Sequence, residues 1–386
     1  MTAADVVVIG GGLIGTATAW RLAAAGLDVT LVVGERSAAA SRVAAGMLAP
    51  VTETTFTERA LLALNQASSR RWPTFSAEVV EASGQPSGLR QGPTLSVASD
   101  PDDSARLRTF ADYLDRQGLE HERLVSRECR ALEPLLAPTV RSGLLVPTDW
   151  SCDNRVLLDA LTVAAQHAGV REVTGFVHRV ESLDDRVTGV TLADGTTLPT
   201  ERVVLANGAW AAQVDGLPTV PVRPVKGQVL RLDPGRFPGP GLTVRAFSRG
   251  NEVYLVPREH GREVVVGATV EEQGFDHRVT AGGVYELLRD AREVIPMTSE
   301  YALAETSVGW RPNTPDNAPI FGGCGLAGLT LSTGHHRNGV LLTPVSADVT
   351  AGFVLTGVLD DVAGAFTLDR FDRDRTVRIP ATGGAR

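Results

Sequence analysis

The stretch that decides the fold of this 386-residue chain is Val6-Val7-Val8-Ile9-Gly10-Gly11-Gly12-Leu13-Ile14-Gly15. Its first four residues are a short apolar run, as is typical of a parallel strand buried on both faces. Residues 16–25 then favour a helix with apolar spacing, and Gly26 can cap its C-terminus. A second apolar run follows at Val29–Val33. This order predicts a βαβ unit of the Rossmann type.

The glycines between the first strand and the helix follow the spacing GxGxxG. Gly10 permits a tight turn, Gly12 lets the backbone approach a pyrophosphate, and Gly15 lets the helix pack closely on the strand. The helix N-terminus offers free N–H groups and a positive dipole end to phosphates. We therefore predict a dinucleotide cofactor, with NAD and FAD both open. The alternative is a glycine-rich turn that serves packing alone.

One position departs from the dinucleotide-binding pattern. An acidic residue at the end of the second strand usually accepts the ribose hydroxyls, but that strand ends in Val33. Glu35 lies two residues further on and is a candidate ribose ligand from an altered loop. The alternative is a solvated charge beside Arg36.

Strand patterns of two kinds alternate along the rest of the chain. Val203–Ala206 is a buried parallel type, whereas 228–232, 253–256 and 264–266 alternate as antiparallel strands do. The fold class expected is α/β (α+β overall): a Rossmann-like domain with a parallel sheet, and an inserted, mainly antiparallel sheet domain. The expected boundaries are 1–87, 146–220 and 306–386 for the cofactor domain, and 88–145 and 221–305 for the substrate domain.

Two local expectations bear on the site. Residues 173–177 have the composition of a single strand that ends at Val177. The segment Gly309-Trp310-Arg311-Pro312-Asn313-Thr314-Pro315-Asp316 is rich in glycine and proline, which favours a loop with a Trp-Arg-Pro turn.

Composition excludes several classes of protein. Apolar residues make up 43% of the chain and charged residues 21%, as in an ordinary globular protein. A net charge of −8 argues against a nucleic-acid or anionic-membrane partner. The three cysteines, Cys129, Cys152 and Cys324, have no metal-ligand spacing, so neither a metal site nor a disulfide framework is expected. No leader is expected at the N-terminus, and the cytoplasm is the predicted compartment.

Six further motifs occur in a fixed order after the glycine turn. Together they resemble the FAD-dependent D-amino acid oxidase superfamily, and most closely the glycine oxidases associated with thiamine thiazole synthesis. The resemblance covers nearly the whole chain. The motifs are Ala44-Ala45-Gly46-Met47-Leu48-Ala49, Pro224-Val225-Lys226-Gly227-Gln228, Tyr254-Leu255-Val256-Pro257-Arg258, Val266-Gly267-Ala268-Thr269, Gly309-Trp310-Arg311-Pro312 and Gly334-His335-His336-Arg337-Asn338-Gly339.

The resemblance implies FAD held without a covalent bond. In related sarcosine oxidases a cysteine in the loop that corresponds to 309–314 tethers the flavin, and this sequence has no cysteine there. N–H groups of the loop before the last helix would stabilise negative charge on the reduced ring. The cofactor contacts implied are Gly10, Gly12, Leu13, Ile14, Gly15, Glu35, Ala45, Gly46, Met47, Val177, Gly208, His336, Arg337, Asn338, Gly339 and Val340.

The resemblance also implies a substrate site. Arg311 and Tyr254 match the residues that bind the substrate carboxylate, and a planar guanidinium suits a carboxylate because it can bond both oxygens. Arg337 matches an arginine near substrate and flavin, and Met47 lies near both or fills the core. His336 stands where an aromatic residue is usual. These four, Arg311, Tyr254, Arg337 and Met47, are the expected substrate-binding residues, the first three also catalytic.

Two charged residues near these motifs need separate interpretations. Glu252 stands where a family histidine approaches substrate, and because a carboxylate would repel an amino acid we expect it to face solvent. Lys226 is the only lysine. We interpret it as a charge at a strand edge with a packed stem, since a catalytic lysine would need burial to lower its pKa.

The activity implied is oxidation of glycine, sarcosine or small D-amino acids to an imine, with O2 reduced to H2O2. Hydrolysis would give glyoxylate and ammonia, or the imine would pass to thiazole synthesis. The partners implied are a small amino acid, O2 and further copies of the chain in a homotetramer. Two alternatives stay open: a dehydrogenase with a non-oxygen acceptor, and a flavin-binding protein without catalysis.

Overall fold

A computed structural model describes residues 4–34, 39–248 and 251–371. Its parallel sheet has the strand order β19-β20-β13-β1-β2-β9. All neighbours run parallel except β19, which is antiparallel to β20. This sheet is drawn from β1 (Val6–Ile9), β2 (Val29–Val33), β9 (Arg171–Thr174), β13 (Val203–Leu205), β19 (Ile320–Gly322) and β20 (Leu329–Thr333).

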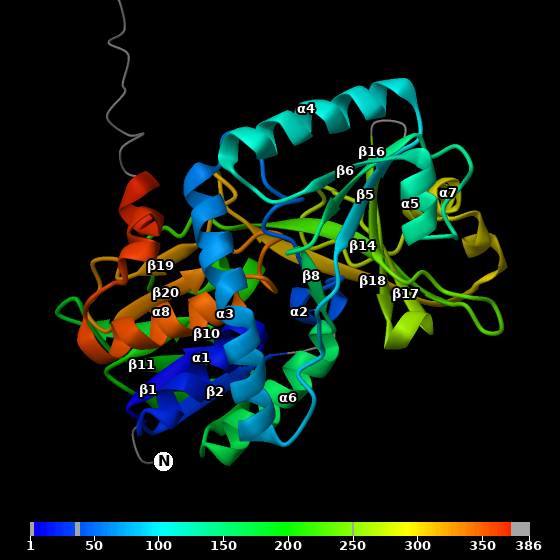
Figure 1. Cartoon of the computed structure of the whole chain (residues 1–386). Coiled ribbons are helices and arrows are strands. Elements are labelled where there is room, and N and C mark those ends of the chain that lie inside the picture. Colours follow the sequence, from blue (N-terminus) through cyan, green and yellow to red (C-terminus); the bar gives the residue numbers. More distant parts are fainter. Residues whose placement is uncertain (1–3, 35–38, 249–250, 372–386) are drawn as a thin grey trace, which may run out of the picture.

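Four helices pack together beside this sheet (Figure 1). They share a core that includes Trp20, Trp72, Phe75, Leu161 and Ala347. Burial of such large apolar side chains, each contributing roughly 1.5–3 kcal/mol, stabilises the layer. The helices are α1 (Leu13–Ala24), α3 (Arg59–Ser83), α6 (Asn154–His167) and α8 (Thr343–Thr356).

The second large sheet has the order β18-β14-β17-β16-β15-β5-β7-β6. Its neighbours are antiparallel except β5 and β15, which run parallel. Its strands are β5 (Thr94–Ala98), β6 (Glu122–Val125), β7 (Ser142–Val146), β14 (Arg223–Asp233), β15 (Thr243–Ser248), β16 (Asn251–Arg258), β17 (Glu263–Gly267) and β18 (Ala302–Asn313).

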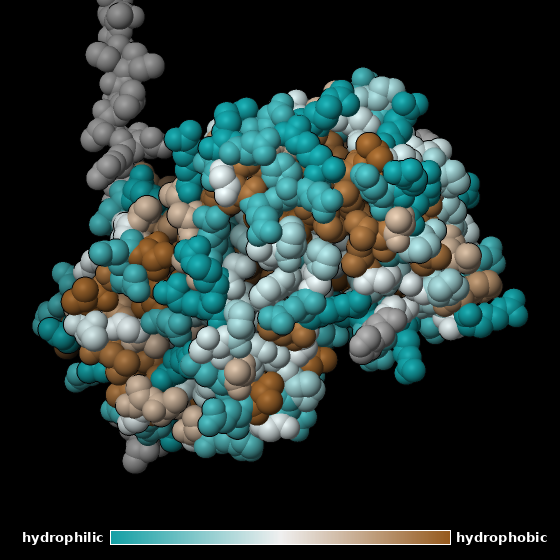
Figure 2. All heavy atoms as spheres, viewed as in Figure 1, coloured by the Kyte–Doolittle hydropathy of each residue, from teal (hydrophilic) through white to brown (hydrophobic). Residues whose placement is uncertain are grey.

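Helices also cover this sheet. α7 (Ala281–Val294) buries Leu287 and Ala291 against it, and α4 (Pro101–Gln117) buries Leu107 and Ala111. Figure 2 shows hydrophilic residues over the outer side of α4 at the top of the molecule. Two short α-helices, α2 (Ala40–Val43) and α5 (Ser126–Leu132), lie outside these layers. One small antiparallel sheet consists of β3 (Met47–Leu48), β8 (Trp150–Cys152) and β4 (Leu89–Arg90). Another consists of β10 (Val177–Leu183), β11 (Arg186–Leu192) and β12 (Thr197–Pro199).

Two local predictions were wrong. The expected strand at 173–177 is two elements: β9 ends at Thr174, the Gly175 N–H still donates to the Val33 carbonyl at 2.9 Å, and Val177 then begins β10 in another sheet. The Trp-Arg-Pro segment is no turn, because it continues β18 in register with β14. Pro312 is tolerated there since β18 is an edge strand, which needs no donor on its outer side.

Within the described ranges, no single helix has both the length and the hydropathy to cross a membrane. The helices Thr343–Thr356 and Asp361–Phe371, which meet at a bend, reach that length and hydropathy only when they are counted together.

Candidate active site

A cavity of about 680 Å³ begins at the glycine turn between β1 and α1 and extends to the edge of the antiparallel sheet. Gly10 has φ +116°, and a Cβ there would lie 2.5 Å from the Ala206 carbonyl oxygen. A Cβ on Gly15 would lie 1.9 Å from the Gly10 carbonyl oxygen. Both positions therefore require glycine, so that the helix starts directly behind the strand.

The start of α1 faces this cavity. Gly12 is its N-cap and supplies no side chain, and the first turn carries no acidic residue. The positive end of the helix dipole is thus free to attract an anion. Ser41, on α2, accepts the Leu13 N–H at 3.0 Å through its hydroxyl oxygen, and it also lines the cavity. Ser41 lies outside the sequence motifs, and only the fold brings it to the glycine turn.

The predicted cofactor contacts divide into two groups. One group lines the cavity: Gly10, Gly12, Leu13, Ile14, Val177, Gly208, His336, Arg337, Gly339 and Val340. The other group is not part of the lining: Gly15, Ala45, Gly46, Met47 and Asn338. Glu35 falls outside the described residues, and Val33, at the usual acidic position, is buried and lines the cavity.

Unsatisfied polar atoms support a ligand with several hydrogen-bonding groups. Asn207 Oδ1, Trp310 Nε1 and His336 Nδ1 are buried without a partner among the described residues, and all three side chains belong to the lining. A buried polar atom without a partner costs about 1–3 kcal/mol. Together with the glycine turn, this donor and acceptor set fits a dinucleotide.

Arg311 and Tyr254 meet at the far end of the cavity. Arg311 Nη1 donates to the carbonyl oxygens of Thr269 at 3.1 Å and Lys226 at 3.5 Å. Arg311 also interacts with the Tyr254 hydroxyl. Burial raises the pKa of that hydroxyl, against the opposing effect of Arg311, so Tyr254 stays protonated and can donate. A planar guanidinium beside a hydroxyl donor can bond both oxygens of a carboxylate.

Two glycines make room for the pair. A Cβ on Gly227 would lie 2.6 Å from Arg311 Nη1, and one on Gly267 would lie 2.4 Å from the Tyr254 hydroxyl oxygen. Met47 packs in the same cluster as Tyr254, beside Val43 and Ala45. Met47 therefore shares an apolar cluster with Tyr254 and is not among the residues that line the cavity.

The loop before α8 carries two adjacent histidines. His336 has φ +46°, a backbone conformation that costs energy for a non-glycine residue and concentrates at functional sites. Burial, followed by the charges of nearby arginines, lowers its pKa to about 3, so its ring is neutral. Burial also lowers the pKa of His335 to about 3, and its Nε2 lies 2.9 Å from the Ser346 hydroxyl oxygen.

Arg337 is exposed and joins two cavities. It donates to the Glu53 carbonyl oxygen at 3.3 Å. Besides lining the main cavity, it lines a second one of about 390 Å³ between α4 and β15. Glu252 also lines the second cavity. Its side chain is 42% exposed, and its carboxylate lies 3.1 Å from Arg245 and 3.4 Å from Arg106. Glu252 thus faces solvent in part, with its charge paired.

Two features of the site were missed. Trp210, Phe275 and Trp310 form a three-ring cluster with centroid separations of 5.3, 5.6 and 5.7 Å, and all three line the cavity. Lys226, expected at a strand edge, is completely buried in the described structure. It is no edge position, because Lys226 on β14 pairs with Trp310 of β18 on one side and forms a bridge to Glu271 on the other. The described residues contain no cluster of three or more metal-ligating side chains.

Comparisons with known proteins agree on one family. The family of FAD-dependent oxidoreductases matches residues 5–352. The chain is 34% identical to the bifunctional protein ThiO/ThiG of Trichormus variabilis over 96% of this chain and 55% of that protein, so it spans about half of that relative's length. It is 31% identical to a glycine oxidase of Geobacillus kaustophilus over 97% of both chains. The crystal structure of a glycine oxidase from G. kaustophilus covers 96% of this chain, and 99% of that chain is covered, with a TM-score of 0.86 and 29% identity.

Proposed function

We propose a function from one premise: the chain belongs to the family of FAD-dependent oxidoreductases. The function is oxidation of glycine and other small amines, sarcosine and small D-amino acids among them, with O2 as the final acceptor. For glycine the balance is glycine, O2 and water giving glyoxylate, ammonia and H2O2. The observation that carries this proposal is the Arg311–Tyr254 pair in the cavity that starts at the glycine turn.

FAD is the cofactor, and bound FAD supplies the acceptor for the hydride equivalent that leaves the substrate Cα. The glycine turn and the N-terminus of α1 would hold its pyrophosphate, and the loop 336–340 would lie at the opposite end of the cofactor. Val177 and Gly208, which also line the cavity, would contact it between these points.

The residues around the substrate bind and orient rather than attack. Arg311 would pair with the carboxylate, and the Tyr254 hydroxyl would donate to it. No nucleophile is needed, because the flavin accepts the hydride equivalent directly from Cα. The protein has only to hold Cα in place and exclude water. Trp210, Phe275 and Trp310 supply an apolar wall suited to that task. Arg337, which lines both cavities, would attract the anionic end of the substrate.

The proposal includes four wider expectations. The ThiO/ThiG relative supports delivery of the imine to thiazole synthesis. We keep the homotetramer, the cytoplasmic location and the domain division at 1–87, 146–220 and 306–386 against 88–145 and 221–305. The boundary between 305 and 306 falls inside β18 (Ala302–Asn313), which pairs with β14 throughout. Arg311 therefore reaches the cavity from the antiparallel sheet.

The decisive experiment uses the purified flavoprotein. Glycine added without oxygen should bleach the flavin absorbance, and readmitted air should restore it with formation of H2O2. Bleaching without peroxide in air would identify a dehydrogenase with another acceptor. An unchanged spectrum with glycine, sarcosine, D-alanine and D-proline would refute amine oxidation.

A further inference from the structure

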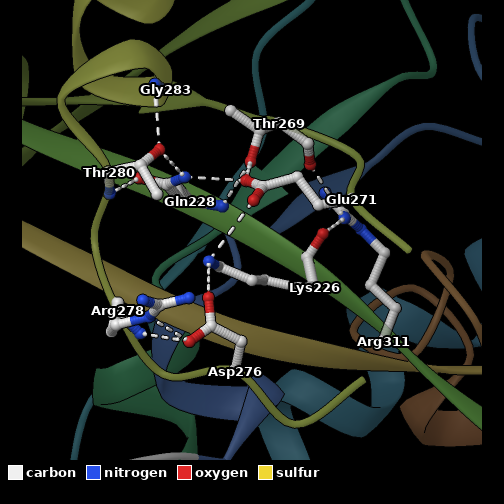
Figure 3. A network of polar contacts seen from close by, with 9 residues as sticks. All are labelled: Lys226, Gln228, Thr269, Glu271, Asp276, Arg278, Thr280, Gly283 and Arg311. Atoms are coloured by element: carbon white, nitrogen blue, oxygen red, sulfur yellow. Dashed lines mark hydrogen bonds and ion pairs between the residues drawn. The ribbon is translucent and has the colours of Figure 1, made fainter. Parts of the chain in front are cut away.

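The main cavity is bordered by a polar network that the proposed chemistry does not use. Its centre is Lys226, whose side chain is completely buried on β14 (Figure 3). Its Nζ lies 2.7 Å from Asp276 Oδ2 and 3.3 Å from Glu271 Oε2. Both carboxylates belong to the segment 268–280 that links β17 to α7, and both are mostly buried.

The Glu271 side of the network leads to the substrate arginine. Glu271 Oε1 accepts from the Thr269 hydroxyl at 2.6 Å and from Gln228 Nε2 at 2.7 Å. The Thr269 carbonyl oxygen in turn accepts from Arg311 Nη1 at 3.1 Å. Because Glu271 fixes Thr269, it also fixes the acceptor that orients the guanidinium.

The Asp276 side leads to the aromatic wall. Phe275 precedes Asp276 in the chain, and its ring lies 5.3 Å from Trp210 and 5.7 Å from Trp310. Asp276 also accepts from Arg278 at 2.7 Å. These hydrogen bonds, first with Arg278 and then with Lys226, lower the pKa of Asp276, so its carboxylate stays charged. The ion pair with Lys226 therefore holds the backbone next to Phe275.

Lys226 is unsuited to acid–base chemistry. Burial alone would lower the pKa of its ammonium group, but hydrogen bonds to Asp276 and Glu271 outweigh that effect and raise the pKa. The group remains protonated, and a catalytic base would need the opposite shift. Its three donors instead suit two fixed carboxylates.

We propose that Lys226 is a positioning residue: through Glu271 it orients Arg311 for the substrate carboxylate, and through Asp276 it holds Phe275 as the wall that limits substrate size. This inference rests on the proposed function, since it names what shapes that site. The two carboxylates divide the work, with Glu271 setting affinity for the carboxylate and Asp276 setting side-chain size.

The first test compares Lys226→Met with Arg231→Met in the flavoprotein. Arg231 is a matched control because it is a buried cation on the same strand, paired with Glu263. We expect Lys226→Met to raise the KM for glycine about tenfold or more and to change kcat less than about threefold. The reason is that loss of the Lys226–Glu271 ion pair would free Arg311 from the orientation that binds the substrate carboxylate. Arg231→Met should lower the Tm and leave the KM within about twofold. Equal KM values in the two variants would reduce Lys226 to a structural residue.

The second test separates the two carboxylates and keeps the inference testable if Lys226→Met does not fold. Glu271→Gln should raise the KM for glycine and leave the ratio of kcat/KM for D-leucine to glycine unchanged. Asp276→Asn and Phe275→Ala should raise that ratio at least about fivefold, because the wall recedes. The same ratio in all three variants would overturn the division of work.

Acetate binding distinguishes failure of this inference from failure of the proposed function. Acetate carries the carboxylate without the amine, so calorimetry reports the Arg311 site without turnover. If wild type binds acetate and Lys226→Met binds it about tenfold more weakly, the positioning role stands whether or not glycine is oxidised. If wild type oxidises glycine and both proteins bind acetate equally, the function stands and the positioning role is wrong. A wild type that neither binds acetate nor is reduced by any amine would refute both.

Discussion

Gly227 on β14 leaves open the space that the Arg311 guanidinium on β18 occupies, since a Cβ at position 227 would lie 2.6 Å from Arg311 Nη1. The atom that would be displaced is the far end of a flexible side chain. Gly227→Ala should therefore shift the guanidinium while changing the Tm by less than about 2 °C, and the KM for glycine should rise roughly tenfold. Steady-state kinetics and a thermal melt check both expectations.

Gly92→Ala is the control, because a Cβ at that glycine meets no atom within 4 Å. Its KM should equal that of wild type. A Gly227→Ala variant with wild-type KM would show that the observed position of Arg311 is not the one that binds substrate.

Truncating Arg311 tests the carboxylate site directly. Removing one partner of a buried, hydrogen-bonded charge pair costs about 2–5 kcal/mol, which corresponds to a rise in KM of roughly 30-fold to several thousandfold. Arg311→Ala should show that rise with glycine. Arg311→Lys retains the charge and loses the planar two-point contact, so its KM should lie between those of wild type and Arg311→Ala. Near-wild-type kinetics in Arg311→Ala would remove Arg311 from the site.

The glycine turn at the start of the cavity could be predicted because its signal is local. Gly10 and Gly15 lie in one short segment, and each answers a steric demand of the same strand–helix junction, whereas a Cβ on Gly12 would meet only the Ser41 side chain. The two-sheet architecture was also predicted, because buried parallel strands and antiparallel strands differ in their hydrophobic pattern. The match to solved glycine oxidases confirms this fold class.

The aromatic wall and the burial of Lys226 could not be predicted, because their contacts join distant segments. Trp210, Phe275 and Trp310 come from three separate parts of the chain, and no periodicity connects them. Burial of Lys226 likewise depends on two carboxylates from a segment that follows β17. Pro312 favoured a turn in the sequence, and only the position of β18 at the sheet edge makes a strand possible there.

Gly15→Ala tests the strand–helix junction. A Cβ at this position would lie 1.9 Å from the Gly10 carbonyl oxygen and 3.4 Å from Ala206 Cβ. Because the closest atom belongs to the backbone, the helix must move away from the strand, and the phosphate site opens with it. We expect the purified variant to retain less than about a tenth of the flavin absorbance per protein of wild type.

Gly352→Ala on α8 is the matched control for this helix substitution, since its Cβ would meet nothing within 4 Å. It should keep full flavin content and a Tm at or slightly above wild type, because alanine favours a helix over glycine by about 1 kcal/mol. Full flavin content in Gly15→Ala would contradict the assignment of the turn to the cofactor.

His336 makes stability depend on acid in a predictable direction. Its folded pKa is about 3, below the ordinary 6.5, because of burial and then the charges of Arg337, Arg311 and Arg223. The unfolded chain therefore binds a proton below about pH 6.5 that the folded chain does not, so the free energy of unfolding decreases as the pH falls from about 7 toward 3. The stabilisation is present above the ordinary pKa and is lost in acid.

His336→Asn removes this titration and keeps a residue that tolerates the left-handed backbone at φ +46°. The drop in Tm between about pH 7.5 and 5.5 should be smaller in the variant than in wild type. His335, with a similarly lowered pKa, and Asp149, whose pKa burial raises to about 6, titrate in both proteins. Their contributions cancel in the difference, so parallel Tm profiles in the two proteins would show that His336 is not held neutral by its surroundings.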